Sequence, residues 1–478
     1  MIETINANCL DVLKETAANS QDLIFCDPPY ALGSDVIIRK DGKPDYRKAV
    51  DFMAKWQQPD GYFWEQWFAE AFRVLRYGGR VVMFGMDRQL MLNKYYACFA
   101  GFAEQQSLYW YTISGFPKAS DLAKQIDRNV GAEREILGAN PNSRPNCSGN
   151  NINTLNGKIT ESTLTTPATT LAQKYNGMKY SIAPLKQTNE TILVFQKPYK
   201  TGSCLHDTLA YENGDAECMC GAVDVEGNRC EISDVTKEAG YRKNAKDYNI
   251  NDEYDSTSFK LNYKVRGNQK DAGFYDTNGR YPAQTYCDDE AAKVLDRQSG
   301  VQKSIGGDGS KFKISVNVPF FEQRTVKEGK NGLGLGDTGG CSRILHRCNY
   351  DLNDYDIYMY CPKVSNKERN EGCGMLETHT SNWNAKSTFQ NTPPEKQQPK
   401  SNNHPTVKPI ALLKKIIQLF KTPNPLHVLD PFMGSGSMGI ACIELGVSYT
   451  GVELDAEYYT IAQTRLAHHN TKNKSKLF

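Results

Sequence analysis

Near the start of the chain, short apolar runs typical of buried strands flank a segment whose apolar residues recur at helical spacing. Residues 22–26 form a short apolar run that predicts a buried strand. A helix is expected near 62–76, because apolar residues recur there at helical spacing: Phe63, Trp67, Phe68, Ala71, Phe72 and Leu75. Gly78 and Gly79 should end it before a buried strand at 80–85. Strand, helix and strand predict an α/β fold.

The end of the chain has the same pattern. Pro409 is placed to start a helix that runs to about Phe420, with Ile410, Leu413 and Ile417 facing inward. The pattern then predicts a strand at 426–430, a glycine loop, a helix at about 437–445, a strand at 449–454 and a helix from 457. The α/β pattern thus resumes.

The middle of the chain differs from both ends. Residues 139–178 are rich in Asn, Thr and Ser and residues 303–340 in Gly, which predicts loops. A strand at 190–197 and a short helix at 289–297 are expected among them. We therefore expect three parts, at 1–137, 138–400 and 401–478, with the middle one an insertion.

Length and charge support this division. A chain of 478 residues is too long for one ordinary core. Its formal charge of +2 is too small for a global nucleic-acid-binding field, so a phosphate-binding surface would be a local patch. The candidate DNA-binding residues, which could also form a solvated loop, are Arg39, Lys40, Lys43, Arg47 and Lys48.

Other classes of protein are disfavoured. No apolar run approaches the roughly 18 residues that span a bilayer, and the N-terminus lacks a basic stretch before an apolar core, so we expect a cytoplasmic protein without membrane contact. The 14 cysteines should then be reduced. We expect no metal, because Cys218-Met-Cys220 has no second close pair at zinc-site spacing, although zinc at the middle cysteines stays open.

A glycine loop, Gly434-Ser-Gly436, follows the strand that ends in Asp430. It opens a helix whose N-terminal amides can hold a carboxylate, and Glu453 ends the next strand, where it can accept both hydroxyls of a ribose. Dinucleotide-binding loops have a third glycine, which is not needed here if the ligand is a nucleoside without a pyrophosphate. The pattern fits S-adenosylmethionine; a plain tight turn is the alternative.

The run Asp27-Pro28-Pro29-Tyr30 follows the first strand. An exocyclic amine of a nucleobase is a poor nucleophile, because its lone pair is delocalised into the ring. The Asp27 carboxylate and the Pro28 carbonyl can accept hydrogen bonds from it and orient the lone pair at a sulfonium methyl. Tyr30 offers a face on which a base flipped out of a duplex can stack. The alternative is a proline turn with a solvent-facing tyrosine.

With a third run, His404-Pro-Thr-Val-Lys-Pro409, the chain resembles the amino-group DNA methyltransferases with permuted motif order, and more narrowly the adenine-specific methylases of phages and prophages. Other matching stretches are 114–135, 279–283, 358–371 and 428–462. The resemblance implies a Rossmann-like, circularly permuted fold with a mixed seven-stranded sheet and helices on both faces. It makes 1–137 catalytic, 138–400 target-recognising and 401–478 cofactor-binding.

The resemblance also assigns residues. It makes Asp27, Pro28, Pro29 and Tyr30 catalytic. The implied cofactor-binding residues are Asn8, Cys9, Leu10, Asp27, Thr406, Lys408, Asp430, Pro431, Phe432, Gly434, Ser435, Gly436, Ser437, Glu453 and Leu454. Of these, Thr406 and Lys408 would lie near the cofactor's carboxylate. Where the family often has Gly-Asp-Cys-Leu, this chain has Asn8 in place of Asp, which predicts weaker cofactor binding.

Two distant segments must then meet. The strands at 22–26 and 426–430 should be neighbours in one parallel sheet, because methyl transfer needs the reacting atoms within roughly 3–3.5 Å. The expected substrate is double-stranded DNA, read in its major groove by polar residues of the insertion.

The target base is inferred by association. Asp27 at the first catalytic position favours adenine, and cytosine methylated at its amino group is the alternative. An RNA or protein-glutamine methyltransferase would typically have Asn there and a smaller insertion. A catalytically dead regulator would have lost part of the catalytic run. The sequence leaves open a homodimer, a restriction endonuclease partner and the recognition sequence.

Overall fold

The computed structural model describes residues 1–29, 36–46, 60–85, 87–112, 118–139, 163–230, 275–276, 279–280, 282–287, 289–303, 311–312, 329–330, 338–339, 341, 345–347, 364–374, 376, 401–404 and 406–475. The chain divides into two compact units. The first comprises Met1–Val223 and Cys348–Phe478, and the second is Asp224–Arg347.

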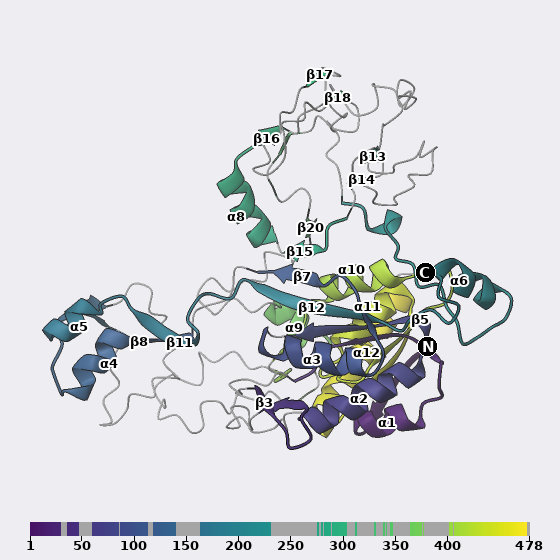
Figure 1. Cartoon of the computed structure of the whole chain (residues 1–478), viewed down its shortest axis with the longest axis horizontal. Coiled ribbons are helices and arrows are strands. Elements are labelled where there is room, and N and C mark those ends of the chain that lie inside the picture. The colour runs from purple at the N-terminus through teal and green to yellow at the C-terminus, as the bar shows by residue number, and fades with distance from the viewer. Residues whose placement is uncertain are drawn as a thin grey trace, which may run out of the picture. The chain divides into compact units, whose positions relative to one another are not determined.

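A mixed sheet forms the centre of the first unit (Figure 1). Its order is β1 (Ile2–Asn6), β22 (Ser448–Glu453), β21 (His427–Asp430), β2 (Gln21–Cys26), β5 (Leu75–Gly85), β12 (Asn189–Gln196) and β7 (Leu108–Tyr111); the two-residue β6 (Ala103–Glu104) also pairs with β12. The strands from β1 to β5 are parallel, and β12 is antiparallel to β5 and β7. The expected α/β class and mixed sheet are confirmed.

The two chain ends share this sheet. Leu23 and Ile24 of β2 pair in parallel with Val428 and Leu429 of β21. The expectation that these strands are neighbours is thus confirmed. Their carboxyl ends, at Cys26 and Asp430, lie at the same edge of the sheet.

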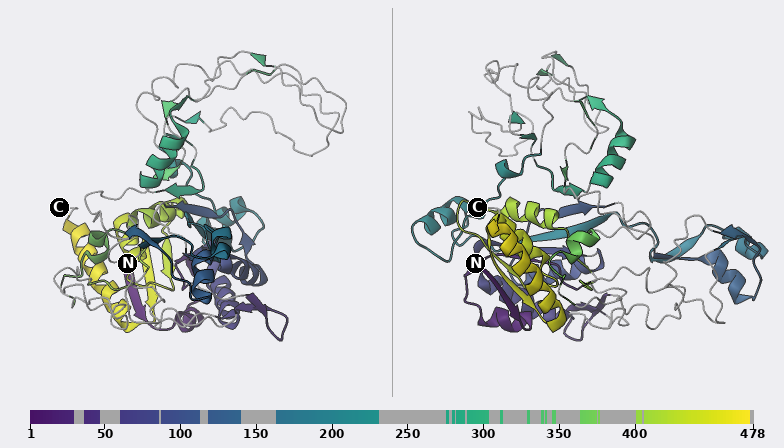
Figure 2. Two further views of the ribbon diagram at one scale, coloured as in Figure 1. Left: turned by 90° about the vertical axis from the view of Figure 1, so that its left-hand side faces the viewer. Right: turned by 180° about the vertical axis from the view of Figure 1, so that it is seen from behind.

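Helices cover both faces of the sheet. Figure 2 places α10 (Ile410–Phe420), α11 (Ser437–Leu445) and α12 (Ala456–Ser475) on one side and α2 (Gly61–Val74) and α3 (Asp87–Phe99) on the other; α1 (Cys9–Glu15) packs against α2. In α2, Asp60 caps the N-terminus by accepting a hydrogen bond from the Phe63 amide at 2.9 Å. Trp64, Trp67 and Phe68 are completely buried, and each contributes about 1.5–3 kcal/mol of apolar burial.

The glycine pair after α2 has a different place from the one expected. The helix ends at Val74, and Gly78 and Gly79 lie inside β5. Gly78 has a φ of +86° and donates its amide to the Lys197 carbonyl at 3.0 Å. The glycine pair that suggested a helix stop thus lies at a kink within a strand. Backbone pairing that only the tertiary fold supplies stabilises this kink.

Further elements of the first unit lie beyond its sheet. They are β3 (Val36–Ile38), β4 (Pro44–Tyr46), β8 (Lys118–Asp121), α4 (Leu122–Asn129), β9 (Ile136–Ala139), β10 (Thr163–Thr165), α5 (Thr170–Lys174), β11 (Lys179–Ala183), α6 (Cys204–Glu212) and α9 (Asn366–Asn370). The expected strand at 190–197 is confirmed as β12. The expectation of loops at 139–178 is wrong at β10 and α5, where Thr169 caps the short helix.

The second unit has mostly short elements among its described residues. The predicted helix at 289–297 is confirmed as α8 (Asp289–Ser299). The strands are β13 (Tyr275–Asp276), β14 (Gly279–Arg280), β15 (Thr285–Cys287), β16 (Gln302–Lys303), β17 (Lys311–Phe312), β18 (Gly329–Lys330), β19 (Thr338–Gly339) and β20 (His346–Arg347). The boundaries of this unit fall inside the expected insertion at 138–400, whereas β12 of that range belongs to the main sheet.

Two features are absent from the described part of the chain. None of its helices has the length and apolar character needed to cross a bilayer. None of its His, Cys, Asp and Glu side chains gather in a group of three or more that could hold a metal ion.

Candidate active site

Acidic residues from four strands lie at the carboxyl edge of the parallel strands. Asp27 follows β2, Asp430 ends β21 and Glu453 ends β22. Glu190 lies near the start of β12, whose antiparallel direction brings that end to the same edge: Thr191 pairs with Gly85, the last residue of β5. Ligands of α/β sheets bind at this edge.

Lys408 joins two of these carboxylates. Its ammonium contacts Asp27 Oδ2 and lies 3.8 Å from Glu190 Oε2. The Phe84 ring centroid is 4.6 Å from the same nitrogen. The side chains of Lys408 and Glu190 are each 8% exposed and that of Asp27 17%, so their charges depend on one another for stabilisation. The resemblance places Lys408 near the carboxylate of the cofactor. In the structure its ammonium pairs with carboxylates of the protein itself.

The proline turn is attached to α3. Gln89, a buried residue of that helix, donates from Nε2 to the Pro29 carbonyl at 3.1 Å. Pro28, which is part of the turn, is buried. Gln89 thus occupies the Pro29 carbonyl, whereas the predicted acceptor for the exocyclic amine of the target base is the Pro28 carbonyl. Tyr30 lies outside the described residues, so its stacking role stays a prediction.

The glycine loop is built around left-handed backbone. Gly434 has a φ of +55° and Gly436 a φ of +80°. A methyl group on Gly434 would lie 2.7 Å from His404 Nε2, so only glycine fits beside that ring. Burial lowers the pKa of His404 to about 4, against the opposing charge of Asp27, so its imidazole is neutral at pH 7. His404 also packs edge-on against Tyr458, with ring centroids 4.6 Å apart.

Arg465 of α12 fixes this loop from below. Its Nη1 donates to the Ser435 carbonyl at 2.6 Å, to the Ser435 hydroxyl at 3.0 Å and to the Ser437 hydroxyl at 3.2 Å. The side chain is fully buried. Both serine hydroxyls that the resemblance assigns to the cofactor therefore have a partner within the protein.

Glu453 is half-buried at the end of β22. It accepts hydrogen bonds from the Gly434 amide at 2.7 Å and from the Asp455 amide at 2.9 Å. Burial raises its pKa, while these amides act in the opposite direction. Each carboxylate oxygen has a second lone pair, so both can still accept hydrogen bonds from a ligand.

Asp430 is buried beneath the loop. The Phe432 amide and the Tyr449 hydroxyl each donate to it at 3.2 Å. Burial raises its pKa to about 8, so the carboxyl is mostly protonated at pH 7. Asp430 is thus a neutral support of the loop.

The other residues assigned to the cofactor have mixed surroundings. Asn8 caps α1 by accepting from the Leu10 amide at 2.9 Å, which competes with its predicted role in cofactor binding. Cys9, Leu10 and Pro431 are buried, and Phe432 packs between the loop and the core, with its ring centroid 6.0 Å from that of Trp67. Thr406 is exposed, and Leu454 is 70% exposed.

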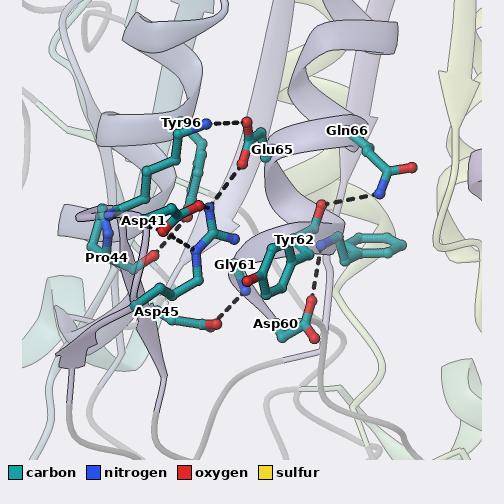
Figure 3. Close-up of polar contacts among 12 residues, drawn as sticks. Asp41, Pro44, Asp45, Asp60, Gly61, Tyr62, Glu65, Gln66 and Tyr96 are labelled. Carbon is teal, nitrogen blue, oxygen red and sulfur yellow. Dashed lines mark hydrogen bonds and ion pairs between the residues drawn. The ribbon is translucent and has the colours of Figure 1, made fainter.

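The basic run forms ion pairs inside the protein. Arg39 donates to Asp41 at 2.8 Å and to Glu65 at 2.9 Å, and Lys43 also pairs with Glu65. Figure 3 shows the surrounding contacts, in which Asp45 accepts from the Gly61 amide at 2.6 Å and Tyr96 donates to the Pro44 carbonyl at 2.6 Å.

These contacts describe the surroundings of two residues of the predicted DNA-binding patch. The Arg39 side chain is only 4% exposed, and carboxylates pair with both Arg39 and Lys43, which attaches the β3–β4 hairpin to α2. Their contact with DNA stays a prediction. Lys40 is exposed and stays a candidate, whereas Arg47 and Lys48 lie outside the described residues.

Three residues at the site were missed from the sequence. Glu190 is an acidic residue at the start of a predicted strand, and His404 is the first residue of the run His404-Pro-Thr-Val-Lys-Pro409. The sequence pattern assigned no function to either residue. Arg465 gave no signal, because an arginine in a polar helix normally lies on its solvated face.

Comparisons of the sequence with known proteins show the family of the chain. A family model described as DNA methylase matches residues 21–464. The type II methyltransferase M2.DpnII of Streptococcus pneumoniae is 33% identical over 131 residues, which are 27% of this chain and 40% of that protein. The DNA adenine methyltransferase YhdJ of Escherichia coli (strain K12) is 40% identical over 78 residues, 16% of this chain and 26% of that protein. The chain spans less than half the length of these relatives.

Solved structures give a weaker likeness. The complex of M1.HpyAVI with SAM aligns at 14% identity over 98% of this chain and 99% of that chain, with a TM-score of 0.33. The strand order of the first unit defines its fold class.

Proposed function

This chain belongs to the DNA methylase family, and on that premise we propose that it transfers a methyl group from S-adenosylmethionine to the exocyclic amine of adenine in double-stranded DNA. One observation carries the proposal. The catalytic turn after β2 and the glycine loop after β21 follow adjacent parallel strands, at one edge of the sheet.

The site's residues fit this cofactor. Glu453 would hold the ribose with its remaining lone pairs. The first amides of α11, which Gly436 cannot cap with a side chain, would hold the carboxylate. Asp27 and Glu190 against Lys408 leave one net negative charge, which suits a sulfonium. When bound, the cofactor supplies an electrophilic methyl group on that sulfonium.

The chain's own residues act on the target amine. Asp27 and the Pro28 carbonyl accept its hydrogen bonds and turn its lone pair out of conjugation with the ring. Lys408 contacts Asp27 at Oδ2, and a carboxylate accepts through both oxygens. Gln89 holds the proline turn against α3, so that Asp27 stays at the sheet edge.

Adenine is the proposed target because Asp stands at the first catalytic position, and because YhdJ is described as a DNA adenine methyltransferase. Cytosine methylated at its amino group is the alternative. We further propose the permuted motif order, the role of 138–400 in target recognition, a DNA contact at Lys40 and a cytoplasmic location, where DNA is accessible. The phage type stays a prediction.

Labelled S-adenosylmethionine tests the proposal when it is offered with duplex DNA, RNA or peptides as acceptors. The expected result is label in duplex DNA with the parent protein and none with Asp27→Ala. Label in RNA or peptide alone would contradict it. Equal labelling of DNA by Asp27→Ala would contradict the assigned chemistry.

A further inference from the structure

We propose that Glu190 is a positioning residue for this transfer: it shares the Lys408 ammonium with Asp27 and receives it when the target amine approaches Asp27. The inference rests on the proposed function, in which Asp27 accepts hydrogen bonds from that amine. It assigns a role to a residue of β12, on the opposite side of β5 from the strand that carries Asp27.

The sheet topology brings Glu190 to the reacting edge. Glu190 is the second residue of β12 and pairs with Trp110 of β7, while the next residue pairs with the end of β5. Phe84, one position before that end, presents its ring 4.6 Å from the Lys408 nitrogen. The ammonium thus has Asp27, Glu190 and an aromatic ring as neighbours.

Asp27 has two competing demands. A hydrogen bond from an ammonium is stronger than one from a neutral aromatic amine, so Lys408 in contact with Asp27 Oδ2 opposes binding of the target. Moving a nearly buried ammonium away from Asp27 would be costly if no second carboxylate received it. Glu190 avoids this cost, because its Oε2 lies 3.8 Å from the ammonium, about 1 Å beyond a direct charged hydrogen bond.

The exchange needs no proton transfer. The three groups carry one net negative charge whichever carboxylate holds the ammonium. Lys408 can therefore move toward Glu190 while Asp27 stays ionised and turns its oxygen to the amine. Without Glu190, the ammonium would stay on Asp27, and the chemical step would slow while cofactor binding would not.

The first test is Glu190→Gln, measured as the single-turnover rate constant with saturating cofactor and duplex DNA. We expect a loss of at least about tenfold in this rate constant and a change below about twofold in the Kd for S-adenosylhomocysteine. The matched control is Glu104→Gln, which removes an exposed ion pair with Lys94 and should leave the rate unchanged. A Glu190→Gln rate within about twofold of the parent overturns the proposal.

A second test reads the shared ammonium without catalysis. In Lys408→Met, Asp27 and Glu190 face each other without their cation, so adding Glu190→Gln should raise the melting temperature. In the parent background the same substitution removes an ion-pair partner and should not raise it. If Glu190→Gln changes the melting temperature equally in both backgrounds, the ammonium is not shared and the proposal is wrong. A parent protein that methylates no DNA would contradict the proposed function, and the melting temperatures would still decide the sharing.

Discussion

Arg465 Nη1 donates to both the carbonyl and the hydroxyl of Ser435, at 2.6 Å and 3.0 Å, from a helix that begins after the loop and its following strand. Its Nη2 reaches the Glu368 carbonyl at 3.3 Å. Burial lowers the pKa of Arg465 to about 10, so it is still charged at neutral pH. A buried cation thus determines the shape of the glycine loop.

Arg465→Met should therefore damage both stability and cofactor binding. The variant leaves buried oxygens of Ser435 and Ser437 without their donor, which costs about 2–4 kcal/mol in the free energy of unfolding of the first unit. Calorimetry should show cofactor affinity weakened at least about tenfold. Arg128→Met on α4, where the side chain is exposed, is the control. Unchanged cofactor affinity in Arg465→Met would show that the loop does not depend on this contact.

Gly434→Ala separates steric conflict from backbone strain. The added methyl would meet His404 at 2.7 Å and would also have to adopt a φ of +55°. Gly446→Ala is a matched control, with a φ of +65° and nothing within 4 Å of the added methyl. Both variants should lose about 1 kcal/mol to strain. Only Gly434→Ala should also lose cofactor binding, measured by calorimetry, and equal effects in both would contradict the assigned packing.

The pH dependence of stability should report on Asp430. Its folded pKa of about 8 is above the roughly 3.9 of an unfolded Asp, so between these values the folded state holds a proton that the unfolded state releases. This contribution to stability is present at low pH and is lost as pH rises toward 8. Asn cannot titrate at this position. The melting temperature of Asp430→Asn relative to that of the parent should therefore be higher at pH 8 than at pH 5. A constant difference would mean that Asp430 is ionised in the folded protein.

Glu453→Ala should weaken cofactor binding at least about tenfold by removing the proposed ribose contact. The substitution also leaves the Gly434 amide without its acceptor, so the melting temperature must be measured beside the Kd. Glu457→Ala, at the second residue of α12, is the comparison for the loss of a carboxylate at the same end of the sheet. Full affinity in Glu453→Ala would remove Glu453 from the site.

Local patterns were sufficient for the strands and loops of the site. Apolar runs that end in Asp27 and Asp430 carry both strand periodicity and turn chemistry, so their place at one edge of a parallel sheet could be predicted. The acid at Glu453 followed from the same strand logic. These features depend on residues close together in sequence.

The ion pairs could not be predicted in this way. Arg39 and Lys43 look like a solvated basic run, yet both pair with Glu65 on α2, and Arg39 also pairs with Asp41. Lys408 is 381 positions from Asp27, and only the fold makes them partners. Pairing between distant charges depends on the docking of elements, which local hydrophobic and turn patterns do not encode.

Nucleoside mass spectrometry tests the central claim most directly. Duplex DNA is incubated with S-adenosylmethionine and either the parent protein or Asp27→Asn, then digested to nucleosides. The proposed chemistry predicts adenine methylated at its exocyclic amine with the parent and none with Asp27→Asn. Methylated cytosine in its place, no methylated nucleoside with the parent, or equal methylation by Asp27→Asn would contradict it.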